Sequence, residues 1–140
     1  MNSGTIKNEP QVIEIPRFRD HRGNLSVIDH EGCLPFEIKR VFYVYDIPTG
    51  IQRGAHAHRE LHQFIFCVAG SIEVCITSQS RTEYCIHLER PWQGLYLPPL
   101  CWAHEASRGG GSVYCVAASD TYKEEDYIRD WQEFLHLTED

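Results

Sequence analysis

The sequence lacks the features that mark several common classes of protein. It has no apolar run near the roughly 20 residues that a membrane-spanning helix needs. Its first residues, MNSGTIKNEPQ, include no apolar core of a secretory signal. Basic residues are in the minority, since 13 Lys and Arg against 20 Asp and Glu give a formal net charge of −7. We therefore expect a cytoplasmic protein with no membrane partner and no nucleic-acid partner, because duplex binding needs a dense cationic surface.

The cysteines follow no recognisable pattern. No C-x-x-C pair is present, and the six cysteines are scattered singly at Cys33, Cys67, Cys75, Cys85, Cys101 and Cys115. Three of them, Cys67, Cys75 and Cys115, lie in apolar runs, where a free cysteine behaves as a small buried hydrophobe. We expect reduced thiols in the core, in keeping with the cytoplasm, rather than structural disulfides or a zinc knot.

The 140 residues, 42% of them hydrophobic and 24% charged, have the length and composition of a single globular domain over 1–140. Short β-branched or aromatic runs, separated by Gly, Pro, Asp or Ser, predict strands along most of the chain. They are Gln11–Ile15, Asn24–Ile28, Glu37–Asp46, His62–Val68, Ser71–Thr77, Thr82–His87, Gly94–Leu97 and Ser112–Ala118. Ala69-Gly70-Ser71 predicts a tight hairpin turn between two of them. The pattern is typical of an all-β sandwich or small barrel.

The C-terminal tail has a different periodicity. Between Tyr122 and Leu137 the apolar residues recur at helical spacing, with charged residues between them. These apolar residues are Tyr127, Ile128, Trp131, Phe134 and Leu135. We expect a C-terminal helix that packs on the outside of the barrel.

Two histidines carry the strongest chemical signal. His56 and His58 flank Ala57, so in an extended segment both imidazoles point to one face. Adjacent imidazoles suit metal binding or proton transfer, because histidine titrates near physiological pH. On these residues alone, a surface turn with two solvated histidines is the alternative.

The surrounding spacing resembles the two motifs of the cupin superfamily. The first is Gly50, His56-x-His58, Gln63 and Gly70, with Gln63 where the motif normally has a glutamate metal ligand. The second is the segment 94–99 followed by His104, which falls where metal-binding cupins keep their third histidine. The resemblance implies a cupin jelly-roll barrel.

A narrower resemblance extends over about 110 residues. The matching blocks are FRDHRGNL at 18–25, PFEIKRVFY at 35–43, RGAHAH at 53–58, GLY at 94–96, Trp102, ASD at 118–120 and DYIR at 126–129. The chain is similar to the cupin-type (WxcM-like, FdtA-type) sugar-nucleotide 3,4-ketoisomerases. This resemblance implies conversion of dTDP-4-keto-6-deoxyglucose to a dTDP-3-keto-6-deoxyhexose, used for the deoxyamino sugars of surface glycans. It also implies no metal, no other cofactor, and a homodimer that exchanges N-terminal strands.

The resemblance also implies catalytic roles. His56 is expected to take and return a proton, since one imidazole can do both in a cycle, and His58 to tune or orient it. The family has a tyrosine pair that relays a proton between substrate oxygens, and here that pair reads Phe42-Tyr43. Tyr43 is the remaining candidate for the relay, with ordinary core packing as its alternative.

Substrate binding is expected to rest on cations, because a nucleoside diphosphate is anionic and the chain already has a charge of −7. Arg53 and Arg40 are candidates for the phosphates, since guanidinium pairs bidentately with phosphate oxygens. Arg22 is a candidate for the sugar. Each arginine has a surface ion pair as its alternative. The remaining candidates for the substrate site are Gln63, Trp102 and His104.

Three other functions remain open from sequence. The first is a metal-dependent cupin enzyme with His56, His58 and His104 as ligands and His62 or Gln63 filling the shell, a set that suits Zn, Fe, Mn or Ni. The second is a nucleotide-sugar 3,5-epimerase. The third is a sugar-binding cupin without turnover.

Overall fold

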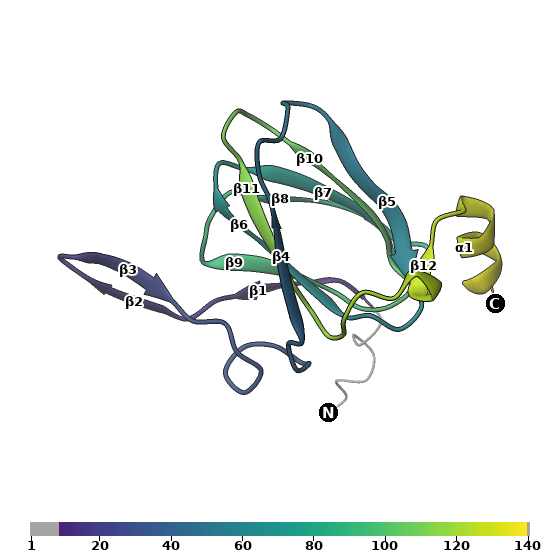
Figure 1. Cartoon of the computed structure of the whole chain (residues 1–140), viewed down its shortest axis with the longest axis horizontal. Helices are drawn as coiled ribbons and strands as arrows, with labels where there is room; N and C mark the ends of the chain where they lie inside the picture. The colour runs from purple at the N-terminus through teal and green to yellow at the C-terminus, as the bar shows by residue number, and fades with distance from the viewer. Residues whose placement is uncertain (1–8, 140) are drawn as a thin grey trace.

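The computed structural model describes residues 9–139 and shows a barrel made of two five-stranded antiparallel sheets (Figure 1). The first sheet, in spatial order, consists of β1 (Gln11–Glu14), β9 (Gln93–Leu97), β6 (Gln63–Ala69), β11 (Val113–Ala118) and β4 (Arg40–Val44). The second consists of β12 (Tyr127–Ile128), β5 (Gln52–His58), β10 (Trp102–Ser107), β7 (Ile72–Thr77) and β8 (Glu83–Leu88). The prediction of an all-β barrel is confirmed.

The main core fills part of the space between the two sheets. Alternate residues of β7, which are Ile72, Val74 and Ile76, are at most 3% exposed. They pack in one cluster with Ile65 and Leu95 of the opposite sheet. Burying one such side chain contributes about 1.5–3 kcal/mol, so this cluster holds the two sheets together.

The outer face of the first sheet has a second apolar layer. Leu34 and Phe36, from the connection before β4, pack with Phe64 and Tyr96 of the sheet. Gly94 is necessary there, because a Cβ at this position would lie 2.1 Å from the ring of Phe64. The layer fixes β6 and β9 from outside and leaves their other face directed into the barrel.

The strands β2 (Arg17–Asp20) and β3 (Gly23–Ser26) form a separate hairpin that projects from the barrel (Figure 1). Every residue in both strands is exposed. Exposed fractions of 62% for Phe18 and 57% for Leu25 are high for large apolar side chains.

The predicted tail helix is wrong in its first half. The segment contains a 3₁₀ turn (Glu124–Asp126), then β12, and only then the helix α1 (Trp131–Leu137). Tyr127 and Ile128 pair with His58 and Ala57 of β5, so the open edge of the second sheet takes up this segment as a strand. The helix begins after Asp130, whose carboxylate accepts a hydrogen bond from the backbone N–H of Gln132.

Two further predictions need correction. The turn at 69–71 is no hairpin, because β6 and β7 belong to different sheets and the turn is a corner between them. The expectation of reduced thiols throughout is also wrong, since Cys75 and Cys85 form a disulfide between β7 and β8. The two are direct register partners with Cα atoms 4.2 Å apart, a proximity that the pattern of each strand alone does not reveal. The other four cysteines are free, with Cys67 and Cys101 buried.

Over residues 9–139 the structure contains no helix that is long and apolar enough to cross a membrane.

Candidate active site in the barrel

A cavity of about 170 Å³ lies inside the barrel beside His56. Its lining residues are Phe42, Val44, Arg53, Gly54, His56, Gln63, Ile65, Leu97, Cys101, Ala103, Glu105, Tyr114, Val116 and Tyr127. Phe42, Arg53 and Gly54 are the exposed members, and they belong to β4 and β5. The cavity therefore opens between these two strands.

A larger cavity of about 920 Å³ lies outside the barrel, against the first sheet. It includes His62, whose Nδ1 lies 2.8 Å from the Tyr96 hydroxyl, but neither His56 nor His58. The barrel cavity is the better candidate, because its polar groups converge and two of its carboxyl and imidazole groups have strongly shifted pKa values.

A β-bulge in β5 directs two functional side chains into the barrel. Gly54 pairs with His104, and His56 pairs with Ala103, so Ala55 is an extra residue without a partner on β10. Gly54 has φ +89°, and a Cβ there would lie 3.1 Å from the Ala103 carbonyl oxygen. Arg53 and His56 are three residues apart, and in a regular strand they would point to opposite faces. The bulge places both of them at the cavity.

His56 is neutral at physiological pH in this environment. Its pKa is lowered to about 4, first by burial and then by the neighbouring His58 and Arg129. The His56 ring lies 5.0 Å from the His58 ring and 5.0 Å from the Tyr127 ring, between centroids. A neutral imidazole can accept a proton directly, so the side chain is in the form that a general base requires.

His58 is almost completely buried behind His56 and is held by a carboxylate. The Nδ1 atom of His58 lies 3.0 Å from Oδ2 of Asp126. Its Nε2 atom has no hydrogen-bond partner among residues 9–139. Burial lowers the pKa of His58, while the hydrogen bond and charge of Asp126 oppose that shift. The carboxylate favours a proton on Nδ1 and leaves Nε2 as the acceptor. Sequence reasoning missed Asp126, although it lies in the DYIR block of the family resemblance.

Glu105 is a second functional candidate that sequence reasoning missed. It lies opposite Arg53 in the β5–β10 register and accepts a hydrogen bond of 2.9 Å from the Tyr114 hydroxyl. Burial raises the pKa of Glu105 to about 7, against the opposing effects of Tyr114 and Arg53. The carboxyl group is therefore close to half-protonated at neutral pH. Only the alternation of β10 could have indicated it, and that strand was not among the predicted ones.

The predicted arginines lie in three different places. Arg53 is exposed at the opening of the cavity. Arg40, at the start of β4, lies near His58, whose pKa its charge lowers, and its guanidinium sits 5.4 Å from the Phe42 ring centroid. Arg22 is at the end of the β2–β3 hairpin, where it pairs with Asp20 at 2.7 Å and its side chain is 80% exposed. Arg22 does not reach the cavity of its own chain.

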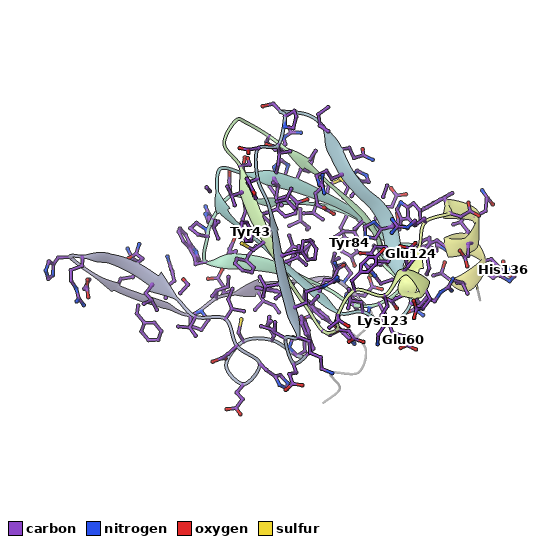
Figure 2. The ribbon with its side chains drawn as sticks, in the orientation of Figure 1. Tyr43, Glu60, Tyr84, Lys123, Glu124 and His136 are labelled. Atoms are coloured by element: carbon purple, nitrogen blue, oxygen red, sulfur yellow. A yellow bond between two sulfur atoms is a disulfide. The ribbon has the colours of Figure 1, made fainter. Side chains whose placement is uncertain are left out.

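Tyr43 does not line the cavity either. It is 63% exposed on the outer side of β4 (Figure 2), and its ring is tilted against that of Tyr45 with 5.6 Å between the centroids. Strand alternation turns Phe42 inward instead, so a phenylalanine occupies the cavity side. The tyrosine that the fold brings to both histidines is Tyr127, from β12.

Trp102 and His104 are likewise on the outer face of their strand, because Ala103 and Glu105 of β10 point inward. Trp102 packs against Trp131 and Phe134 of the C-terminal helix, with ring centroids 5.2 and 5.7 Å apart. His104 therefore lies on the opposite side of the sheet from the cavity. The structure does not assemble the three-histidine metal site that the second motif predicted.

Gln63, in contrast, lines the cavity, at the position where the cupin motif has its carboxylate ligand. Across residues 9–139, the one group of three potential ligands close enough to share a metal ion is Glu73, Cys75 and Cys85, outside the barrel. Among the described residues, the lining of the cavity thus brings no three such ligands together.

Two antiparallel sheets around a cavity lined by His56 define a cupin jelly-roll protein. A family model described as "FdtA: WxcM-like, C-terminal" matches residues 8–139. The chain belongs to this family.

Three similar proteins are a 3,4-oxoisomerase and two 3,4-ketoisomerases. The chain is 37% identical over 126 residues, 90% of each chain, to the TDP-4-oxo-6-deoxy-alpha-D-glucose-3,4-oxoisomerase of Aneurinibacillus thermoaerophilus. A crystal structure of a 3,4-ketoisomerase from Helicobacter canadensis superposes with a TM-score of 0.88 at 36% identity, covering 94% of this chain and 98% of that one. A mutant of the 3,4-ketoisomerase QdtA from Thermoanaerobacterium thermosaccharolyticum, in complex with TDP-4-keto-6-deoxyglucose, gives a TM-score of 0.87 at 33% identity over 92% and 93% of the two chains.

Proposed function

We propose that this protein is a sugar-nucleotide 3,4-ketoisomerase that converts dTDP-4-keto-6-deoxyglucose to a dTDP-3-keto-6-deoxyhexose. The relatives named above carry this activity or bind this substrate. The observation in this chain that supports it most is the neutral His56 at the cavity, backed by His58 and Asp126. An imidazole pair without a carboxylate metal ligand suits an isomerisation that consists only of proton transfers.

The reaction moves a carbonyl from C4 to C3 in two halves. A base removes the proton from C3, and the electron pair forms the C3–C4 double bond of an enediolate with its charge on O4. A proton moves from O3 to O4, the carbonyl forms at C3, and C4 receives a proton. No oxidant is needed, because C3 is oxidised as C4 is reduced. We assign the removal at C3 and the return at C4 to His56.

The low pKa of His56 fits this role. With a pKa of about 4 it is unprotonated when the substrate arrives. The pyrophosphate and the developing enediolate then bring negative charge close to the ring, and nearby negative charge raises the pKa of an imidazole. His56 thus becomes a stronger base as the reaction needs it, and the imidazolium formed stabilises the enediolate.

His58 and Tyr127 supply the remaining parts of the proposed machinery. The Asp126 carboxylate fixes the orientation of His58 and leaves Nε2 as a buried acceptor. Tyr127 touches both imidazole rings, with 4.5 Å between its centroid and that of His58. We assign to the Tyr127 hydroxyl the proton relay between the substrate oxygens, because Phe42 has no hydroxyl.

The size of the cavity suggests how a nucleotide sugar would lie. Its volume of about 170 Å³ is below the roughly 300–1,000 Å³ of sites for drug-sized ligands. We assign it to the hexose alone. The nucleotide then extends through the opening between β4 and β5, where Arg53 is placed to pair with phosphate oxygens.

We also propose the homodimer that the family resemblance implies. The exposed apolar side chains Phe18 and Leu25 on the projecting hairpin, and Val41 and Tyr43 on the outer side of β4, support a second copy as their cover. If the two subunits exchange their N-terminal strands, the β2–β3 hairpin takes Arg22 to the neighbouring subunit. A dimer of twice 16.2 kDa in sedimentation equilibrium is expected, and a monomer at micromolar concentration would contradict it. The cytoplasmic location and the use of the product in lipopolysaccharide or O-antigen sugars stay predictions.

The activity is tested by NMR of dTDP-4-keto-6-deoxyglucose with the purified protein in deuterated water. We expect loss of the starting ketone, deuterium at C4 of the product and a new 3-keto sugar, whose coupling constants give the configuration at C4. Binding of the sugar nucleotide without exchange at C3 or C4 would instead identify a non-catalytic sugar-nucleotide-binding protein. Exchange at C5 would identify an epimerase.

A further inference from the structure

The outer face of the second sheet has a group of metal-ligating side chains that the proposed reaction does not use. Cys75 and Cys85 face each other across β7 and β8, and Glu73 lies on the same face of β7. The two Sγ atoms and a carboxylate oxygen of Glu73 all lie within 4.8 Å of one another. In the disulfide the two Sγ atoms are bonded to each other, so they can share a zinc ion, with bonds of roughly 2.0–2.3 Å, only after that bond is reduced and the sulfurs move apart.

An imidazole lies next to this group, although its nitrogens are not within 4.8 Å of all three ligand atoms. His104 is the register partner of Cys75 on β10, so the row across the sheet reads Cys85, Cys75, His104. The same three residues line a cavity of about 510 Å³ that also includes Trp102 and Trp131. Cys85 is exposed, and the cavity gives access from solvent.

We propose that Cys75 and Cys85 are a thiol–disulfide couple whose dithiol form, together with Glu73 and His104, binds one Zn²⁺ ion. Two thiolates, one imidazole and one carboxylate are ligand types that zinc accepts in a tetrahedral site. Zinc is favoured over magnesium or calcium, because those ions prefer sites made only of oxygen ligands. The site does not depend on the proposed isomerase activity.

The two forms exclude each other by their chemistry. In the disulfide, each sulfur is bonded to the other and neither is a thiolate. A small dithiol reductant donates two electrons and two protons, the Cys75–Cys85 bond breaks to give two thiols, and the reductant becomes a disulfide. Zinc then binds the two sulfurs as thiolates and releases the two protons to solvent.

The charge around the site is suited to the ion. Two thiolates and the Glu73 carboxylate have three negative charges, and the ion has two positive ones. Arg108 offsets the remainder, since its Nη1 lies 3.1 Å from Oε1 of Glu73. His87 contacts the other carboxylate oxygen of Glu73 at 3.3 Å. Glu73 is thereby held in place by groups on its own side of the sheet.

The test measures metal directly. The full-length protein is reduced with a phosphine, freed of reductant without oxygen, loaded with Zn²⁺ and passed through a desalting column for elemental analysis. We expect one zinc per chain in the reduced protein and none in the protein kept as the disulfide. Co²⁺ in place of zinc should give the near-ultraviolet charge-transfer absorption of a thiolate ligand. A reduced protein that retains no zinc, or an oxidised one that retains as much, would overturn the proposal.

Matched variants separate this site from adventitious binding. Cys75→Ser and Cys85→Ser should each lose stoichiometric zinc and the thiolate absorption, and His104→Ala should weaken zinc binding by about 10-fold or more. Cys33→Ser and His136→Ala, which change the same residue types elsewhere, should bind zinc as the wild type does. Circular dichroism and thermal unfolding check that each variant is folded. Equal zinc binding by folded Cys75→Ser and wild-type protein contradicts the assignment.

Discussion

His58 and Asp126 are 68 residues apart in the chain, yet Nδ1 of the one lies 3.0 Å from Oδ2 of the other. The contact is made where β12 adds to the edge of β5, directly after the 3₁₀ turn that contains Asp126. Asp126 also accepts the backbone N–H of Glu60 at 2.8 Å, so its carboxylate is fixed from two sides. The C-terminal segment thus positions the second histidine of the site and does more than cover the barrel.

Asp126→Asn should therefore impair catalysis without preventing substrate binding. The amide is similar in shape, but it lacks the charge that raises the pKa of His58, and it can present its NH₂ group to Nδ1 and favour the wrong tautomer. We expect kcat to fall by about 10²-fold, within the range for an acid–base group, with KM within about threefold. Steady-state kinetics measure both parameters.

Asp120→Asn is the matched control, since Asp120 precedes the same segment and pairs with the exposed Lys123 at 2.8 Å. Its kinetics should equal those of the wild type. A wild-type kcat for Asp126→Asn would remove the positioning role.

His56→Asn tests the general base itself. Asparagine has about the same shape and one hydrogen-bonding group but no titratable nitrogen. We expect kcat to fall by about 10²–10⁴-fold, equivalent to ~3–5 kcal/mol of barrier. Exhaustive treatment of the wild type with a chelator should leave turnover unchanged. A requirement for stoichiometric metal would overturn the proposed mechanism, and so would full activity of His56→Asn.

The same substitution should alter the dependence of stability on pH. The pKa of His56 is about 4 in the fold, and the ordinary value is 6.5. The unfolded chain therefore binds more protons between these values, and the free energy of unfolding falls as pH is lowered from 6.5 to 4. His56→Asn should make this acid loss shallower. Urea unfolding at pH 7 and pH 4.5 measures the free energy of unfolding at each pH. An equal fall in that free energy between the two pH values for wild type and variant would contradict the low pKa of His56.

Glu105 should have the opposite effect. Its pKa of about 7 in the fold is above the ordinary 4.5, so the folded protein binds the extra proton between these values. Stability contributed by the protonated carboxyl is complete below pH 4.5 and is lost as pH rises to 7. The shift corresponds to about 3 kcal/mol, so Glu105→Gln should gain roughly that much stability relative to wild type between pH 4.5 and pH 8. Glu83→Gln, on the exposed side of β8, should show no such gain. An equal change in stability for the two variants would contradict the raised pKa of Glu105.

The barrel and its principal histidines were accessible from sequence for a physical reason. Alternating apolar residues such as Ile72, Val74 and Ile76 report burial on one face, and strand burial is a local property. The H-x-H pattern likewise places His56 and His58 on one side without reference to the rest of the chain. Motif spacing added the fold class, which the structure confirms.

The errors in the site have a common cause, which is that register between strands is not local. Had the sequence predicted the strand β10, alternation would have placed Glu105 inward and His104 outward. Its segment WAHEAS, however, lacks a clear alternation of apolar and polar residues. The bulge at Ala55 reverses the side on which Arg53 lies relative to a regular strand. Asp126 and Tyr127 reach the histidines only because β12 adds to an open sheet edge, and their helical spacing gives no sign of that.

Tyr43 and Tyr127 test whether sequence or structure identifies the proton relay correctly. Tyr127→Phe removes the hydroxyl of a ring that lies beside both imidazoles, whereas Tyr43→Phe removes one from the outer side of β4. We expect Tyr127→Phe to lower kcat by about 10²-fold and Tyr43→Phe to stay within about twofold of the wild type. Phe42→Tyr adds a hydroxyl inside the cavity and should restore part of the activity lost in Tyr127→Phe when the two changes are combined. The kcat values of the four proteins and of the double variant form the measurement. If Tyr43→Phe is the inactive variant, then β4 must turn its other face to the substrate, and the proposed relay through Tyr127 is wrong.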